Sequence, residues 1–302
     1  MLAEFPPLML MQRIEDAMTS RNPYLIDGPA QICFSGGRTS GYLLHQILEA
    51  NAGLPKDVHV TFQNTGKERA ETLDFIQECA QRWNVHVNWL EWDGRGADGG
   101  FRRPSWKIVD YASADRIGTP FERLIAEKGY LPNVAHRICT ANLKIRVGEA
   151  FMRSLGHDEW DSVMGIRADE PRRATRMMAS GRDNSAGMPV IPLYAAGVTK
   201  PEILAWWKSQ PFDLRLDPEG DLGNCDLCFL KARAKNVAAL RTEPERAIWW
   251  IKQERAVGNT FIKGYVSYAD LIREADFMNS QIEMFPEAPE DDERIADCMC
   301  GD

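Results

Sequence analysis

The chain has 302 residues, of which 44% are hydrophobic and 26% charged, and this composition excludes an intrinsically disordered protein. Its length suffices for a full α/β core, with a small appended domain. The formal net charge of -8 argues against a protein whose whole surface binds nucleic acid, although a local basic patch remains compatible with it.

Apolar runs predict strands that alternate with amphipathic helices. The predicted strands lie at 30–35, 57–66, 85–92, 160–167 and 188–194, and the predicted helices at 40–50, 67–83, 119–129 and 140–155. Thr199 begins a further helix, with Glu202 completing a capping box. This alternation predicts an α/β fold with a doubly wound, mainly parallel sheet. We assign residues 1–215 to this domain and 216–302 to a mainly helical C-terminal region.

The chain carries no apolar run near the roughly 20 residues that a membrane-spanning helix needs. Its N-terminus has a short apolar patch, without the basic residues before it or the cleavage site after it that mark a signal peptide. We therefore expect a cytoplasmic protein with no membrane partner. In a reducing compartment, its seven cysteines are expected to serve metal binding, catalysis or burial rather than disulfides.

A glycine-rich loop follows the first predicted strand and opens a helix, with the sequence Ser35-Gly36-Gly37-Arg38-Thr39-Ser40. Unpaired amides and the helix dipole make such a helix N-terminus an anion site. Glycines let the backbone approach phosphate oxygens, and hydroxyl and guanidinium groups add donors. The loop lacks the lysine of the P-loop motif and the spacing of the dinucleotide motif. A tight turn between core elements is the alternative.

Two further motifs follow in order, FQNTGKERAETLDFI at 62–76 and GIRADEPRRA at 165–174. Together with the loop, they resemble the PP-loop ATP pyrophosphatase superfamily, in its phosphoadenosine-phosphosulfate (PAPS) reductase-like branch. The resemblance covers about residues 30 to 235 and implies an adenine nucleotide alpha hydrolase-like fold. It implies ATP or a related adenine nucleotide as ligand, with Mg²⁺ on the phosphates.

The resemblance also implies roles for the residues at matching positions. The implied nucleotide-binding residues are Ser35, Gly36, Gly37, Arg38, Thr39, Ser40, Asn64, Thr65, Gly66, Gly165, Arg167, Glu170 and Arg172 or Arg173. Among these, catalytic roles are expected for Ser35, Arg38, Ser40 and Arg167.

The cysteines suggest a second centre. Cys225 and Cys228 form a Cys-x-x-Cys turn, which can hold one metal or cluster. Three interpretations are open: a four-iron cluster, a structural zinc, or a reactive cysteine without a metal. The cluster ligands would be Cys139, Cys225, Cys228 and Cys300, with Cys298 as the alternative fourth ligand. The resemblance favours the 4Fe-4S cluster, since the branch includes members that carry one. Cys33 and Cys79 are predicted to be buried apolar residues.

PAPS reductases also carry a C-terminal Glu-Cys-Gly-aliphatic-His motif, which this chain lacks. The resemblance therefore implies adenylation of an acceptor, followed by displacement of AMP by a sulfur or nitrogen nucleophile. The chain resembles sulfurtransferases of DNA phosphorothioation systems, tRNA-thiolating enzymes and phage-borne reductase-like proteins. A PAPS or APS (adenosine phosphosulfate) reductase is one alternative, and a non-catalytic nucleotide sensor with a structural cluster is another.

The partners implied by a sulfurtransferase are a nucleic-acid acceptor and a cysteine desulfurase as sulfur donor, and a homodimer is compatible with them. The loop at 93–106 supports the acceptor, because its basic residues Arg95, Arg102 and Arg103 stand beside Phe101 and Trp106. A lid that closes over ATP alone would explain the same residues.

Overall fold

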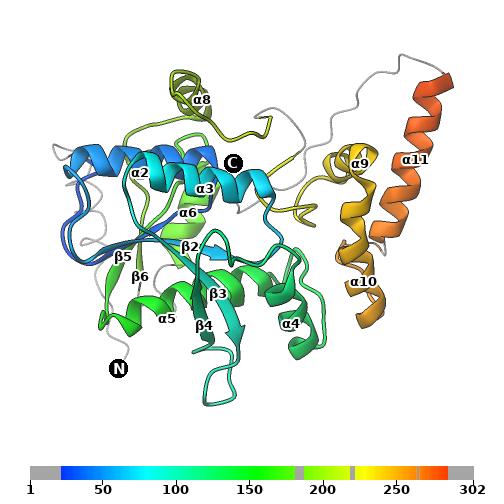
Figure 1. Cartoon of the computed structure of the whole chain (residues 1–302), viewed down its shortest axis with the longest axis horizontal. Coiled ribbons are helices and arrows are strands. Elements are labelled where there is room, and N and C mark those ends of the chain that lie inside the picture. The colour runs from blue at the N-terminus through cyan, green and yellow to red at the C-terminus, as the bar shows by residue number, and fades with distance from the viewer. Residues whose placement is uncertain (1–21, 181–186, 218–221, 263, 265, 285–302) are drawn as a thin grey trace.

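The computed structural model describes residues 22–180, 187–217, 222–262, 264 and 266–284 (Figure 1). These residues form one six-stranded sheet with strand order β4-β3-β2-β1-β5-β6. The strands are β1 Ala30–Cys33, β2 Val58–Asn64, β3 Val87–Gly94, β4 Ser105–Val109, β5 Trp160–Val163 and β6 Gly187–Val190. All neighbouring pairs are parallel except β3 and β4. The predicted α/β fold with a doubly wound, mainly parallel sheet is therefore confirmed.

Helices cover both faces of this sheet (Figure 1). On one face, α2 (Arg38–Ala50) and α3 (Ala70–Arg82) pack Leu44, Ile47 and Ile76 against Val60 of β2 in one buried cluster. On the other face, α4 (Thr119–Lys128) and α5 (Arg146–Ser154) bury a second cluster. Side chains alternate along each strand, so β2 sends apolar residues to the first face and His59, Thr61 and Gln63 to the second.

The remaining described helices are α6 Pro171–Ser180, α7 Pro192–Ala195, α8 Lys200–Lys208, α9 Arg233–Thr242, α10 Ala247–Val257 and α11 Tyr268–Met284. A 3₁₀ turn at Pro244–Arg246 precedes α10. The predicted capping box at α8 is present, because the Thr199 backbone N–H and hydroxyl both donate to the Glu202 carboxylate, at 2.7 and 2.6 Å. None of the helices in the described part of the chain has the length and apolar character needed to cross a bilayer.

The C-terminal helices share a core with the sheet. Trp250 of α10 and Tyr268 of α11 are fully buried in the same cluster as Leu90 of β3 and Phe151 of α5. Trp250 and Tyr268 stack with their ring centroids 5.0 Å apart. The boundary near residue 215 stays a prediction, and buried residues on both sides of it pack together.

Three elements differ from the sequence-based expectation. The loop predicted at 93–106 ends in β4, an edge strand that pairs antiparallel with β3. The strand predicted at 188–194 ends with β6 at Val190, and the helix α7 follows at Pro192–Ala195, because proline fits the first turn of a helix.

The helix predicted over 140–155 begins as a π-helix at Thr140–Ile145 and continues as α5. Single-turn π segments are frequent at functional sites, and this π-helix borders the cavity described below.

Candidate active site

The glycine-rich loop lies at the carboxyl end of β1, the central strand of the sheet. The chain leaves β1 toward β2 on one side, and β5 pairs with β1 on the other. Open α/β sheets bind ligands at such a switch point. Within the loop, the Gly37 N–H donates to the Ser40 hydroxyl at 3.2 Å, and the Ser35 and Ser40 hydroxyl oxygens are 3.1 Å apart. These contacts fix the hydroxyls beside the first turn of α2.

A cavity of about 360 Å³ opens below this loop. It is lined by the predicted residues Ser35, Thr39, Ser40 and Gly165, together with Gln31, Cys33, Phe62, Gln63, Thr140, Lys144, Ile145, Glu149, Ser162, Met164, Arg173, Met177, Gly187 and Pro189. The structure thus brings the first and third motifs to one cavity. The absence of a side chain at Gly165 lets the third motif approach the glycine-rich loop, since a Cβ there would lie 3.3 Å from Thr39 Cγ2.

The third motif folds over the loop through charged contacts. Arg167 Nη1 donates to the Thr39 hydroxyl at 3.2 Å, and its backbone N–H donates to Glu170 at 3.0 Å. Glu170 in turn accepts a hydrogen bond from Arg173 at 2.7 Å. Arg173 lines the cavity, whereas Arg172 is exposed on α6. Of the two predicted alternatives, Arg173 is therefore the one beside the cavity.

Arg38 lies elsewhere than its predicted phosphate-binding role requires. Its buried guanidinium donates to both carboxylate oxygens of Asp213 at 2.8 and 2.9 Å, and to the carbonyls of Leu214 and Leu216. A guanidinium satisfies its donors in a planar fork, and here the 213–216 segment fills that fork. Arg38 thus anchors this segment to α2 and does not line the cavity.

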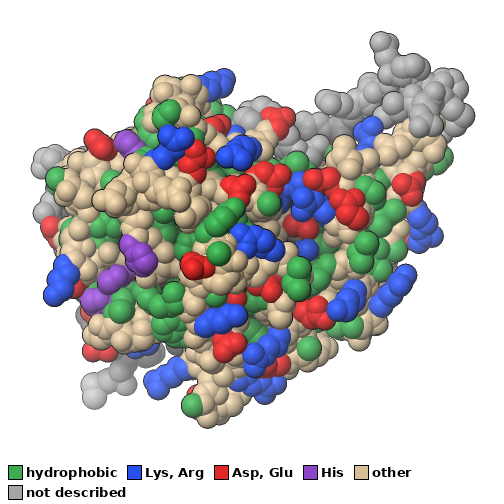
Figure 2. Space-filling view, viewed as in Figure 1, with side chains coloured by type: hydrophobic (Ala, Val, Ile, Leu, Met, Phe, Trp, Pro, Cys, Tyr) green, Lys and Arg blue, Asp and Glu red, His purple; other side chains and the backbone are tan. Residues whose placement is uncertain are grey.

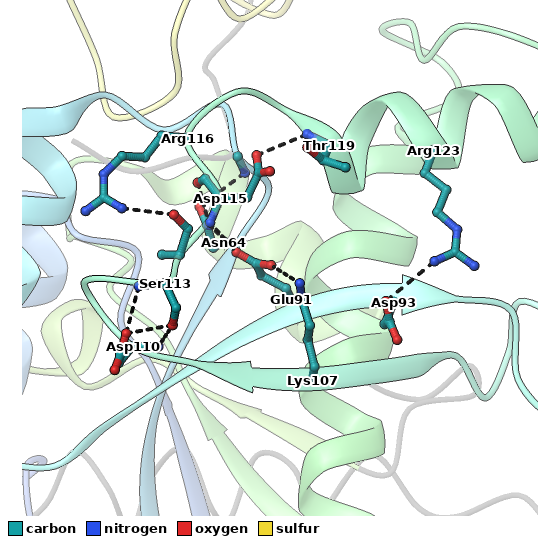
Figure 3. Close-up of polar contacts among 12 residues, drawn as sticks. Asn64, Glu91, Asp93, Lys107, Asp110, Ser113, Asp115, Arg116, Thr119 and Arg123 are labelled. Carbon is teal, nitrogen blue, oxygen red and sulfur yellow. Dashed lines mark hydrogen bonds and ion pairs between the residues drawn. The ribbon is translucent and has the colours of Figure 1, made fainter.

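The second motif reaches the cavity only through Phe62 and Gln63, and its predicted nucleotide-binding residues do not line it. Asn64 at the end of β2 donates to Glu91 of β3 at 2.7 Å and to the Asp115 carbonyl at 2.8 Å. Figure 3 shows Glu91 between Asn64 and Lys107, with Lys107 Nζ 3.1 Å from the Glu91 carboxylate. Gly66 has φ +77°, and a Cβ there would lie 2.1 Å from Asp115 Oδ1. These residues hold the loop before α4, and their predicted nucleotide contact stays a prediction.

Thr65 begins a series of polar contacts that runs from the end of β2 to the residues around the cysteines. Its backbone N–H and its hydroxyl donate to the buried Glu68 carboxylate at 2.9 and 2.8 Å. The other oxygen of Glu68 is 3.4 Å from Lys144 Nζ. Lys144 lines the cavity, and none of the predicted site residues includes it. Its place in the first turns of a helix following Cys139 was the available signal.

The Cys-x-x-Cys segment pairs with the second motif. Cys225 forms an antiparallel bridge with Glu68, and the Asp226 N–H donates to the Lys67 carbonyl at 2.7 Å. Cys139 immediately precedes the π-helix. Burial, and then the neighbouring Cys225 thiol, raise the pKa of Cys139 to about 11, with Lys144 opposing the shift. Both thiols pack against the large apolar cluster that also contains Cys228.

Among the described residues, these three cysteines do not by themselves form a metal site. In the described part of the chain, no group of three or more His, Cys, Asp or Glu side chains has a metal-binding arrangement, and no disulfide joins the five described cysteines. The predicted fourth ligands, Cys300 and Cys298, lie outside the described residues. Cys33 lines the cavity rather than only the core, and burial raises its pKa to about 12. Cys79 is buried as predicted.

The structure confirms the α/β fold, with the glycine-rich loop between β1 and α2, and membership of the PP-loop superfamily stays a prediction from the motifs. The uncharacterized nin region protein ORF290 of Escherichia phage lambda is 33% identical over 221 residues, which cover 70% of this chain and 69% of that protein. The chain belongs to the family of this phage protein. No protein-family model matches the sequence.

Three solved structures are distantly similar to the chain. The U34-tRNA thiolase NcsA from Methanococcus maripaludis, with its [4Fe-4S] cluster, has 12% identity and a TM-score of 0.44, covering 95% of this chain and 86% of that one. The PAPS reductase from Candida auris, in a phosphate complex, has 11% identity and a TM-score of 0.40, over 68% and 87%. The NH3-dependent NAD synthetase from Campylobacter jejuni, with nitrate, has 11% identity and a TM-score of 0.35, over 95% and 96%.

Proposed function

We propose that the protein is an ATP pyrophosphatase that adenylates an acceptor for sulfur transfer in nucleic-acid modification. One observation carries the proposal. The π-helix that supplies Lys144 to the cavity of the phosphate loop is directly preceded by Cys139, which neighbours Cys225. One helical segment thus connects the cavity beside the loop with the thiols of Cys139 and Cys225, so that an activated acceptor and a sulfur nucleophile could meet there.

In the proposed reaction, an acceptor oxygen attacks the α-phosphorus of ATP, the bond to the β-phosphate breaks, and pyrophosphate leaves. A sulfur nucleophile then forms a bond to the acceptor atom that carries the adenylate, and AMP leaves with the oxygen. Loop amides and the hydroxyls of Ser35 and Ser40 would hold the phosphates, and Lys144 and Arg173 would stabilise charge on the leaving pyrophosphate. ATP would enter as its Mg²⁺ complex.

The first test is pyrophosphate release. We expect the wild-type protein to release pyrophosphate from ATP, and the double variant Ser35→Ala, Ser40→Ala to lose about 100-fold of that rate, because each hydroxyl is a positioned donor. Ser105→Ala, an exposed serine on β4, is the matched control and should keep the rate. Equal rates in all three proteins would contradict the proposed role of the loop.

The alternatives have different readouts. Thiol-dependent sulfite release from PAPS or APS would show a reductase instead. Tight nucleotide binding without turnover, in the presence of candidate acceptors, would show a nucleotide sensor.

The cluster predicted from the cysteine pattern remains part of this proposal, with a test of its own. Protein purified without air should contain iron and sulfide and absorb at about 400 nm, and Cys225→Ser should lose both metal and absorption. A colourless wild-type protein that contains zinc would replace the cluster with a structural zinc. A colourless, metal-free protein that still transfers sulfur would assign the chemistry to the thiols alone.

A nucleic-acid acceptor is supported by the connection between β3 and β4. Arg102 and Arg103 are exposed there, and Arg95 and Lys128 lie over the Phe101 ring, 4.7 and 3.4 Å from its centroid. Figure 2 shows lysine and arginine side chains around this connection, at the bottom of the view, with acidic side chains among them. Binding of tRNA or single-stranded DNA should weaken with salt, and less steeply in the variant Arg102→Ser, Arg103→Ser.

A further inference from the structure

Three cations meet where the connection between β3 and β4 approaches α4 and α5 (Figure 1). Arg95 belongs to this connection, Lys128 to the last turn of α4, and Arg146 is the first residue of α5. The Phe101 ring holds two of them, with Lys128 Nζ 3.4 Å and Arg95 Cζ 4.7 Å from its centroid. Arg146 joins them because α4 packs against the π-helix that directly precedes this residue. These three residues are called here the three-cation cluster.

The cluster carries more positive charge than its neighbours neutralise. Arg95 forms an ion pair with Glu127 at 3.0 Å, and Arg123 shares that carboxylate at 3.0 Å. Within the described part of the chain, neither Lys128 nor Arg146 forms an ion pair with a carboxylate, and both side chains are half-buried. Burial, and then the charges of Arg146 and Arg95, lower the pKa of Lys128. A bound anion would relieve this repulsion.

The cluster lies beside the mouth of the cavity. Lys144 and Ile145 directly precede Arg146 and line the cavity, and Ile145 is 52% exposed, so the cavity opens there. The three cations themselves do not line it. A ligand held at the cluster therefore lies outside the cavity and next to its opening. Along the connection, the exposed Arg102 and Arg103 continue the positive surface.

We propose that the three-cation cluster binds one backbone phosphate of a single-stranded nucleic acid and so places the acceptor beside the cavity. This inference rests on the proposed function, in which the acceptor is a nucleic acid. The charged oxygens of a phosphodiester accept hydrogen bonds from two cations at once. A free phosphate ion reaches the cluster alone, whereas a strand also reaches Arg102 and Arg103, which favours a polyanion. A phosphate contact positions the strand without reading its bases.

The test measures binding of short labelled DNA and RNA strands of one sequence to the full chain by fluorescence anisotropy. Lys128→Gln and Arg146→Gln should each weaken binding about tenfold on both strands, and lower the slope of log affinity against log salt by about 0.7. The double variant should lose less than about thirtyfold, rather than the roughly hundredfold of independent contacts, because the two cations share one phosphate. Lys208→Gln, an exposed change on α8 over the other face of the sheet, is the matched control and should keep the wild-type affinity.

A further variant changes no charge. Phe101→Leu keeps an apolar side chain and removes the ring that holds Arg95 and Lys128. It should weaken binding of both strands about threefold, the size of one exposed cation–π contact, and leave the salt slope unchanged. Wild-type affinity in this variant would contradict the role of the ring in positioning the cations.

Wild-type affinity in both single variants, or a double variant whose loss equals the product of the single losses, would overturn the shared phosphate. A loss confined to DNA or to RNA would also overturn it, since the two strands have the same phosphates and differ in their sugars. So would a wild-type protein that binds neither strand. The proposed enzymatic function fails separately, because coupled losses in a protein that releases no pyrophosphate from ATP would keep the phosphate site and reject the pyrophosphatase.

Discussion

Gly36 is under two independent constraints at the start of α2. Its φ of +79° lies in the left-handed region that glycine adopts at no steric cost. A Cβ at this position would lie 2.6 Å from Thr72 Cγ2 and 2.7 Å from Ile76 Cδ1, both on α3. The residue therefore sets both the turn of the phosphate loop and the spacing between that loop and α3.

A pair of alanine substitutions separates these two constraints. Gly99 has a similar φ of +71°, with nothing within 4 Å of the position of a Cβ. We expect Gly99→Ala to lower the free energy of unfolding by about 1 kcal/mol through backbone strain alone. Gly36→Ala should lower it by a further 1–3 kcal/mol, roughly, because its methyl group overpacks the contact with α3. Urea denaturation measures the free energy of unfolding of both variants. Equal decreases would show that α3 moves to accommodate the added methyl group without cost.

For single residues, the sequence predicts which residues belong to a motif better than it predicts where their side chains point. Ser35, Thr39 and Ser40 line the cavity as expected, because a motif at a helix N-terminus leaves them few other orientations. Arg38 sits within the same motif, and its long side chain reaches the 213–216 segment instead. Neither this partner nor the cavity-facing position of Glu149 could be predicted, because both depend on segments that meet only in the folded chain.

The pairing of the second motif with the Cys-x-x-Cys segment depends on buried charges. Lys67 Nζ is 3.1 Å from the buried Asp226 carboxylate, and Arg69 and Arg246 approach the same carboxylate at 3.9 and 3.8 Å. Lys67 also lies over the Trp249 ring, 5.0 Å from its centroid. Asp226 is thus the anion shared by three cations at the contact between the sheet and the C-terminal helices.

Removing this shared anion should be costly. Asp226→Ala leaves the buried Lys67 without its carboxylate partner, so we expect a loss of about 3–5 kcal/mol in the free energy of unfolding. Glu122→Ala removes an ion pair with Lys252 that also joins the two regions but is exposed, and should change stability by less than about 1 kcal/mol. Comparable losses in the two variants would contradict the buried network.

Elements with strong apolar periodicity were predicted, and elements defined by their neighbours were not. The helices α2, α3 and α4 lie within a few residues of their predicted ranges. β4 has mostly exposed side chains and a short sequence, so it forms a strand only because β3 offers an edge. The π-helix has the apolar pattern of an ordinary helix, so the sequence does not distinguish it from one.

Over the whole molecule, histidines make stability depend on pH. His59 faces His157 with the ring centroids 5.7 Å apart, and it packs against Phe151. Burial lowers the pKa of His59, and the neighbouring His157 and His86 lower it further, against the opposing charge of Asp57. The unfolded chain therefore binds a proton at this residue more readily than the folded chain does.

The sign of the effect follows from that difference. Stability is full above the ordinary histidine pKa of 6.5 and falls as pH decreases through it, until the folded state also takes up the proton. Urea denaturation at about pH 7.5 and pH 5.5 should show this loss. The loss should be smaller in His59→Phe, which keeps the ring contact with Phe151. An identical pH dependence in that variant would assign the loss to other groups.

The fold as a whole was predictable from the sequence, because alternating strands and helices admit few arrangements with right-handed connections. The shared core between the sheet and the C-terminal helices was not, since α9, α10 and α11 show weak periodicity on their own. Only the buried aromatic residues, such as Trp250 and Phe261, indicate in retrospect that these helices have a partner.

The antiparallel contact between Glu68 and Cys225 joins segments that are made at different times during synthesis of the chain. A ribosome that has made the first two hundred residues has already delivered the phosphate loop, the central strands and Lys67, but not Asp226. Until Asp226 has been added, Lys67 lacks this partner, and it also lacks the Trp249 ring that covers it in the folded chain. The contact between the second motif and the Cys-x-x-Cys segment therefore forms only after most of the chain has been made.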